Sequence, residues 1–209
     1  MAATNQATIT SEPTAVRLLD ATERLVGERG IDGVSLRTIN AEAGSNVAAA
    51  HYHFGSKAAL VRAVLDRRTA VLAEERYRQL SALESDPAPS VRALAAVFVE
   101  PLFAFSLDAE GAPYVRFLAA LYRAGGEWFK VLDEAFAPQA ERLGPLFARA
   151  TRELDADRRH LRLSLASETM VRMLADPERY VGNLEAESFL AEVTGVFTAI
   201  LTAPVLEAP

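Results

Sequence analysis

The chain has 209 residues, no cysteine and a formal net charge of −6 at pH 7. Without cysteine it cannot form disulfides, thiolate nucleophiles or cysteine-based zinc sites, and no apolar run reaches the about 20 residues of a membrane-spanning helix. The acidic total argues against indiscriminate nucleic-acid binding, although residues 1–80 hold 10 Lys and Arg against 9 Asp and Glu, whereas residues 81–209 hold 12 against 19. Because residues 1–13 also lack the features of a signal peptide, we expect a soluble, cytoplasmic protein.

The N-terminal part of the chain predicts four helices after a polar, unpatterned arm at residues 1–12, which we expect to be disordered. Ser35 and Ser56 are placed to cap helices, and Gly55 can close one. Two short helices joined by a tight turn and flanked by supporting helices form a helix-turn-helix unit. The expected helices span residues 13–29, 36–43, 46–53 and 56–81. We therefore predict a DNA-binding domain at residues 13–55 and a connecting helix at residues 56–83.

The remainder of the chain is also predicted to be helical, and the fold class is all-α. Residues 84–90 contain Pro87 and Pro89 and form the clearest linker. Residues 91–209 show no alternating strand pattern and are expected to form a second, larger helical domain. Ser90 caps its first helix, which Pro101 is expected to disturb. The later helices are expected at residues 113–123, at 127–154 with a break at Pro138 or Gly144–Pro145, at 155–176, and at 184–202 with Asn183 as cap.

The last predicted helix is apolar over a broad surface. Phe189, Val193, Val196, Phe197 and Ile200 follow each other at helical spacing. A terminal helix of this kind usually has two neighbours to bury against. We expect one neighbour to be its own domain and the other a second copy of the chain. The alternative is an ordinary core helix whose excess apolar residues are covered by a loop.

Three segments carry a family resemblance: SLRTI at residues 35–39, AEAG at 41–44 and HYHFGSK at 51–57. Over about residues 14–62 they resemble the N-terminal domain of the TetR family of bacterial transcriptional regulators. The resemblance implies a regulator that binds double-stranded DNA, with residues 91–209 as its effector-binding and dimerisation domain. We expect a repressor that binds a palindromic operator and responds to a small-molecule effector.

We also expect a homodimer that pairs through the last two long helices as a four-helix bundle. The residues expected at this interface are Leu165, Met173, Phe189, Val193, Val196, Phe197 and Ile200.

In a helix-turn-helix the second helix enters the major groove, while flanking groups hold phosphates. Arg37 has the fork geometry that matches guanine O6 and N7, whereas Val47 and Ala49 offer apolar contact, for which a thymine methyl is the natural partner. His53 and Lys57 suit phosphate, Lys57 because it lies in the first turn of a helix. Since the reading helix has few polar groups, Arg37 is expected to carry more of the specificity. The DNA-binding candidates are Arg37, Thr38, Asn46, Val47, Ala49, His51, Tyr52, His53 and Lys57.

Other residues near this region have different expected roles. Phe54 is expected in the core, and His51 either touches DNA or braces its helix. Arg62, Arg67 and Arg68 are expected on a solvated face, because the fourth helix leads away from the duplex.

Ten of the sixteen aromatic residues lie between residues 98 and 147. They either fill a helical core, where aromatic residues dominate burial, or line a ligand cavity, as the resemblance implies. The ligand-binding candidates are Phe98, Phe103, Tyr114, Phe117, Tyr122, Trp128 and Phe129. Polar candidates that could orient a ligand are Glu100, Tyr114, Arg116, Tyr122 and His160.

Motifs of an enzyme are missing from the sequence. Gly55-Ser56-Lys57 lacks the order of a phosphate-binding loop, and His51 and His53 would point about 200° apart on a helix, which does not suit a metal. We expect no catalytic residue, cofactor or metal site. The alternative function is a helical small-molecule carrier or enzyme that does not act on DNA; an activator or nucleoid-associated protein would share the DNA chemistry.

Overall fold

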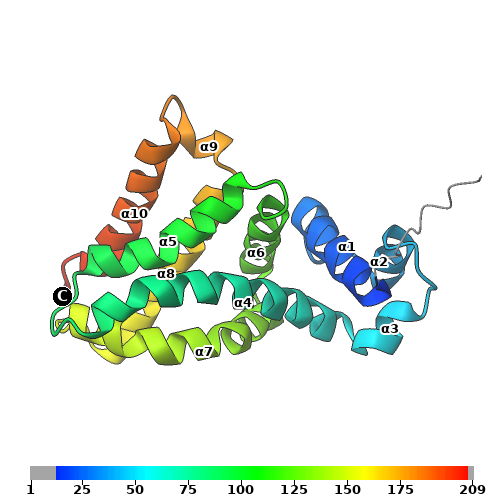
Figure 1. Cartoon of the computed structure of the whole chain (residues 1–209), viewed down its shortest axis with the longest axis horizontal. Helices are drawn as coiled ribbons and strands as arrows, with labels where there is room; N and C mark the ends of the chain where they lie inside the picture. Colours follow the sequence, from blue (N-terminus) through cyan, green and yellow to red (C-terminus); the bar gives the residue numbers. More distant parts are fainter. Residues whose placement is uncertain (1–12, 207–209) are drawn as a thin grey trace, which may run out of the picture.

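The computed structural model describes residues 13–206, which fold into ten α-helices and no strand (Figure 1). The expected all-α class is confirmed, whereas the predicted arm at residues 1–12 lies outside the described residues. Helices α1 to α3 form a head at one end of the molecule, and α5 to α10 form a larger body. The helices are α1 (Thr14–Arg29), α2 (Leu36–Glu42), α3 (Ala49–Phe54), α4 (Lys57–Glu84), α5 (Val91–Leu107), α6 (Ala112–Ala124), α7 (Glu127–Ala150), α8 (Ala156–Ala175), α9 (Glu178–Val181) and α10 (Ala186–Thr202).

Helix α4 belongs to both parts. It packs against α1 and α3 in the head, and it runs beside α5 and α7 in the body (Figure 1). Helix α1 also packs on α6, so the head rests directly on the body. A change in the body can therefore reach the head along α4 and through the α1–α6 contact.

The predicted caps of the head are confirmed. The Ser35 hydroxyl accepts a hydrogen bond from the backbone N–H of Thr38 at 3.1 Å, and the Ser56 hydroxyl accepts one from that of Ala59 at 3.1 Å. Each bond satisfies an N–H group that the first turn of a helix leaves open. Gly55 closes α3 with a φ of 77°, which glycine adopts without steric cost.

Helix α3 begins at Ala49, later than the predicted start at Asn46. The Asn46 side chain accepts a hydrogen bond from the backbone N–H of Ala48 at 3.0 Å, and the Asn40 amide donates to the carbonyl of Val47 at 2.8 Å. Side-chain bonds of this kind hold a turn where a helix would otherwise start. The turn of the helix-turn-helix therefore extends into the predicted reading helix.

The predicted break at Pro138 or Gly144–Pro145 is wrong, and Pro101 does not interrupt its helix. Helix α5 continues across Pro101, and α7 continues across Pro138, Gly144 and Pro145. Pro138 and Pro145 are exposed, seven residues apart on the outer side of α7. A proline removes one helical hydrogen bond, but the buried side chains on both sides of it hold the helix against its neighbours.

The C-terminal part differs from the prediction mainly in one connection. Asp155 caps α8, accepting a hydrogen bond from the backbone N–H of Arg158 at 2.8 Å. The short helix α9 then follows Pro177, and α10 begins after Glu185 rather than Asn183. None of the helices within residues 13–206 is long and apolar enough to cross a membrane.

Three residues expected at the dimer interface are core residues of the single chain. Phe189, Val193 and Phe197 are 3%, 1% and 1% exposed, because α10 packs them against α5 and α8. The ring centroids of Phe197 and Phe98 lie 5.8 Å apart, and those of Phe189 and Phe103 lie 6.4 Å apart. Helical spacing identifies an apolar stripe but not the neighbour that it faces. The other expected interface residues remain partly or largely exposed: Leu165, Met173, Val196 and Ile200.

Candidate nucleic-acid interface and effector cavity

The tip of the head presents large side chains to solvent. Val47 is 69% exposed and Tyr52 is 85% exposed. Burying such apolar surface would be favourable, so a binding partner that covers these side chains would gain stability. The Tyr52 ring packs edge-on against that of His53, with centroids 5.2 Å apart. Among the predicted DNA-binding residues, Arg37, Asn46, Val47, His51, Tyr52 and His53 are exposed, whereas Thr38, Ala49 and Lys57 are partly buried.

Arg37 lies on α2 and is exposed beside this tip. None of the ion pairs within residues 13–206 involves Arg37, in contrast to Arg24 and Arg62 nearby in the sequence. Thr38 is held at the start of α2, where its hydroxyl lies 2.8 Å from that of Ser35. An exposed guanidinium without an acidic partner is free to take an external one.

Asn40 holds the helix-turn-helix together, and the sequence reasoning missed it. Its side chain is buried, with the residue 1% exposed. The amide nitrogen donates to the carbonyls of Leu36 at 2.9 Å and Val47 at 2.8 Å. The amide oxygen accepts from the backbone N–H of Ala50 at 2.9 Å and from the hydroxyl of Ser45 at 3.1 Å. One amide thus links α2, the turn and α3. A polar residue next to Ile39 on the inner side of α2 was the available signal.

The predicted phosphate contact of Lys57 is not supported by the geometry. Its ammonium group donates to the carbonyl of Ile31 and lies 5.9 Å from the centroid of the Trp128 ring, on α7. Burial lowers the pKa of Lys57, while the charges of Asp32 and Glu127 oppose that shift. The side chain therefore turns toward the junction with the body and away from the tip of the head.

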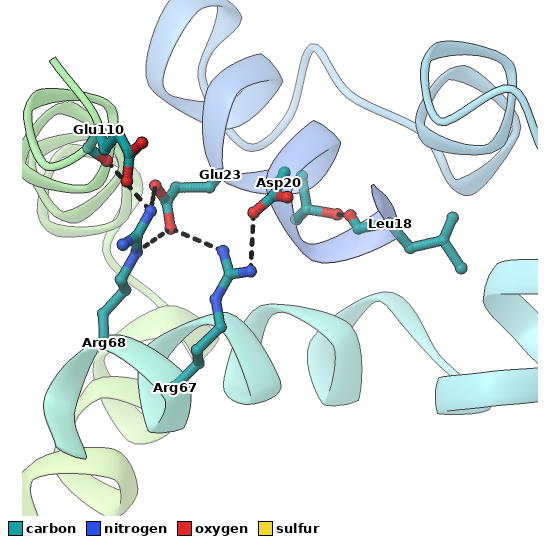
Figure 2. A network of polar contacts seen from close by, with 7 residues as sticks. Leu18, Asp20, Glu23, Arg67, Arg68 and Glu110 are labelled. Atoms are coloured by element: carbon teal, nitrogen blue, oxygen red, sulfur yellow. Dashed lines mark hydrogen bonds and ion pairs between the residues drawn. The ribbon is translucent and has the colours of Figure 1, made fainter. Parts of the chain in front are cut away.

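The junction between head and body contains a buried carboxylate, that of Glu23 on α1 (Figure 2). Glu23 is 2% exposed. The Arg68 guanidinium donates to both of its carboxylate oxygens, with N–O distances of 2.8 Å each, and Arg67 donates to one of them at 3.2 Å. Arg67 also pairs with Asp20 at 2.7 Å. A carboxylate that receives three charge-assisted hydrogen bonds holds its partners in fixed positions.

The same network reaches the body. Arg68 donates to the backbone carbonyl of Glu110, between α5 and α6, at 3.1 Å (Figure 2). Its hydrogen bond to Glu23 raises the pKa of Arg68, against the effect of burial. The prediction that Arg67 and Arg68 form a solvated face is therefore wrong, because α1 lies over them. Arg62 is different: it pairs with Asp66 at 2.7 Å and Glu134 at 3.6 Å near the surface.

The body encloses a cavity of about 380 Å³ between α4, α5, α6, α7 and α8. Its wall is mainly apolar, and its volume lies in the range of sites for small organic ligands. Four of the predicted ligand-binding residues line it: Phe98, Tyr114, Tyr122 and Phe129. The other three, Phe103, Phe117 and Trp128, are buried elsewhere in the core. Part of the aromatic region thus lines a cavity, and part of it fills the helical core.

The predicted polar ligand contacts divide in the same way. Tyr114, Tyr122 and His160 line the cavity, whereas Glu100 and Arg116 are exposed outside it. Burial and, to a lesser extent, the nearby charges of Asp133 and Glu168 raise the pKa of Tyr122 to about 12. Burial also raises the pKa of Tyr114, so both phenols stay protonated at neutral pH.

Arg76 of α4 is a cavity residue that the sequence reasoning missed. It is 5% exposed. A signal was present in the spacing, because Arg76 falls between Leu72 and Leu80, both buried on the inner side of α4. A charged residue at a core position of a helix marks a site that requires a special partner.

Comparison with protein families gives two matches. The model for "Bacterial regulatory proteins, tetR family" matches residues 18–64, from α1 to the first turns of α4. The model for "Tetracyclin repressor-like, C-terminal domain" matches residues 96–201, which include the cavity wall from α5 to α8. A search of curated protein sequences finds no significant match.

Several solved structures share the fold. The transcriptional regulator FadR from Bacillus subtilis, in complex with stearoyl-CoA, is 14% identical with a TM-score of 0.61, covering 91% of this chain and 99% of that chain. The fatty acid degradation regulator FadR from Bacillus halodurans is 16% identical with a TM-score of 0.60, over 92% and 96%. NalD of Pseudomonas aeruginosa, the secondary repressor of the MexAB-OprM multidrug efflux pump, is 23% identical with a TM-score of 0.54, over 88% and 96%.

Proposed function

Since the chain belongs to the tetR family of bacterial regulatory proteins, it is a DNA-binding transcriptional regulator, and we propose that it is a repressor released by a ligand. The observation that carries this proposal is that one helix, α4, joins the exposed tip of the head to the apolar cavity of the body. A ligand in the cavity would favour a conformation in which the two heads of a dimer are wrongly spaced. DNA affinity then falls by the difference in ligand affinity between the two states.

The DNA site would be a palindromic operator, read by two heads at half-sites about 34 to 36 Å apart. Helix α3 would lie in the major groove, where Val47, Ala49 and Tyr52 meet base edges and thymine methyl groups. Arg37 would take guanine, and His53 would hold phosphate. The exposure of Arg37, Val47 and Tyr52 in the free protein supports this assignment.

The dimer would form on the outer sides of α8 and α10. Leu161 and Leu165 of α8 are 57% and 48% exposed, and both also line the cavity. On α10 the outer side carries small residues, among them Gly195 and Ala199. Small side chains let two helices approach closely. Gly195 and Ala199 therefore replace Phe189, Val193 and Phe197 as the expected centre of the interface.

Two of the similar structures support a ligand-responsive repressor. NalD is a repressor by its printed description, and FadR of Bacillus subtilis holds stearoyl-CoA. Their identity to this chain is below 25%, so they support only the type of regulation. The class of effector is inferred from the cavity itself.

The alternative is a helical carrier or enzyme that does not act on DNA. We propose that the protein is not an enzyme, and that it acts in the cytoplasm, where its DNA lies. Selection of bound oligonucleotides from a random duplex pool distinguishes a regulator from a carrier or enzyme that does not act on DNA. A regulator enriches a palindrome and binds it with strong salt dependence. A carrier enriches no sequence.

Arg37→Ala weakens binding to the selected operator by about 1 to 3 kcal/mol and relaxes specificity at one base pair of each half-site. The reason is the loss of a bidentate contact to guanine. Arg29→Ala is the matched control, because Arg29 is exposed at the opposite end of α1 from the tip. Fluorescence anisotropy with the operator and with single-base variants measures the effect. Equal affinities of the two variants would refute the role of Arg37.

Gly195→Arg and Ala199→Arg prevent dimerisation while the chain stays folded. A Cβ at Gly195 would meet no atom within 4 Å inside the chain, so the single chain can accept a side chain there. A partner helix packed against this side would be displaced by two long cations. Ala137→Arg on the exposed side of α7 is the control. Analytical ultracentrifugation measures the oligomeric state. A dimer that persists in both Gly195→Arg and Ala199→Arg would exclude this surface as the interface.

A further inference from the structure

The cavity contains a buried cation that has no acidic partner. Arg76 is 5% exposed, and its Nε atom makes no hydrogen bond within the described residues. Its Nη2 atom donates to the carbonyl of Phe98 at 3.3 Å, and its guanidinium lies 4.9 Å from the centroid of the Phe98 ring. These contacts replace only part of the hydration that the charge loses on burial.

The groups around Arg76 are neutral. Burial lowers the pKa of Arg76, and the opposing effects come from Tyr114, Tyr122 and Tyr77, with no carboxylate among them. The Tyr114 hydroxyl is buried too and makes no hydrogen bond of ordinary geometry within the described residues, although Thr69 lies beside it. An unpaired guanidinium and an unpaired phenol thus face the same cavity.

Acidic residues of the cavity wall do not change this picture. Asp133 is exposed, Glu168 is partly exposed, and both act on Tyr122 rather than on Arg76. Arg76 contrasts with Arg68, two turns earlier on α4, whose guanidinium is fully engaged by Glu23. The sequence therefore supplies a carboxylate where α4 meets the head and omits one where α4 meets the cavity.

We propose that the effector is an amphipathic carboxylate whose anionic group pairs with Arg76 and accepts a hydrogen bond from Tyr114. Its apolar part packs against the aromatic wall formed by Phe98, Phe129 and Phe136. The planar fork of arginine matches the two oxygens of a carboxylate. The proposal rests on the proposed function in one respect: it takes this cavity as the effector site.

Isothermal titration calorimetry with matched probes tests the ligand class. The probes are decanoate, decanamide and decylamine for an aliphatic ligand, and 2-naphthoate with 2-naphthamide for an aromatic one. We expect at least one carboxylate to bind the wild type about tenfold or more tighter than its amide, and decylamine to bind weakest. Arg76→Met should abolish the preference, and Arg76→Lys should keep part of it. Arg116→Met, an exposed arginine outside the cavity, should change nothing.

Thermal unfolding of the ligand-free protein separates a binding role from a structural one. If Arg76 is kept for a ligand, Arg76→Met raises Tm, because it removes an uncompensated buried charge. If Arg76 stabilises the fold, Tm falls. Three outcomes would each overturn the proposal. They are a lower Tm for Arg76→Met, carboxylates that bind the wild type no tighter than their amides, and a preference for carboxylates that survives in Arg76→Met. Operator binding by the ligand-free wild type is measured separately, so failure of the DNA function is seen independently of the ligand result.

Discussion

Glu23→Ala lowers the free energy of unfolding by about 3 kcal/mol. Glu23 is 2% exposed and is shared by Arg67 and Arg68, so its removal leaves two partly buried guanidinium groups without their common counter-charge (Figure 2). Removing one partner of a buried ion pair costs more than the pair contributes, because the remaining charge stays desolvated. Urea unfolding followed by circular dichroism measures the loss.

Glu28→Ala is the matched control on the same helix. Glu28 pairs with Arg24 at 3.1 Å, and both side chains are more than one-third exposed. Exposed pairs of this kind contribute little, so we expect a change within about 0.5 kcal/mol. If the two variants prove equally stable, the carboxylate of Glu23 does not hold the junction, and α1 is fixed to α4 by apolar packing alone.

The position of this network suggests how the two parts of the molecule communicate. Arg68 and Arg76 are eight residues apart on α4, about 12 Å along the helix axis. The first holds the head through Glu23, and the second faces the cavity. A ligand that draws Arg76 toward it therefore acts on the same rigid helix that positions the head. Under the proposed function, a small shift of α4 would change the spacing of the two heads of the dimer.

The sequence predicted most of the helices because their ends carry local signals. The caps at Ser35, Ser56 and Ser90 depend on one side chain and the turn that follows it, and all three are present. Pro101 and Pro138 misled the prediction, because their local cost is smaller than the packing energy of the helices that contain them. The start of α3 was missed because it depends on a hydrogen bond from another helix, donated by Asn40 of α2 to the carbonyl of Val47.

The candidate sites were predictable to the extent that they consist of exposed residues in a known motif. Arg37 and Tyr52 lie where the motif places them, at the surface. Lys57 and Arg76 could not be assigned from spacing alone, because their surroundings come from α7 and from α5 and α6. Likewise, the stripe of α10 has the same spacing whether it faces its own core or a second chain. The packing of the folded chain decides which neighbour covers each of these residues, and the spacing of residues in one sequence does not show that packing.

Asn40→Ala is expected to have the second largest effect, a loss of about 3 kcal/mol in the stability of the head. The change leaves the buried backbone N–H of Ala50 and the partly buried carbonyl of Val47 without their partner. Each unsatisfied group costs about 1 to 3 kcal/mol, and the bond that fixes α3 to α2 is lost as well. Since α3 must keep its angle to α2 to enter the major groove, operator affinity should fall by about tenfold or more.

Asn46→Ala separates the two consequences of that change. Asn46 is exposed and makes one local bond, to the N–H of Ala48, so its loss should cost about 1 kcal/mol or less in stability. Hydrogen exchange at the amide of Ala50 reports the Asn40 bond directly: exchange should accelerate in Asn40→Ala and stay slow in Asn46→Ala. Slow exchange in both variants would mean that Ala50 is protected by the helix itself. In that case the angle of α3 would be set by the packing of Ala50 and Ile39 in the core, and the amide of Asn40 would not position the reading helix.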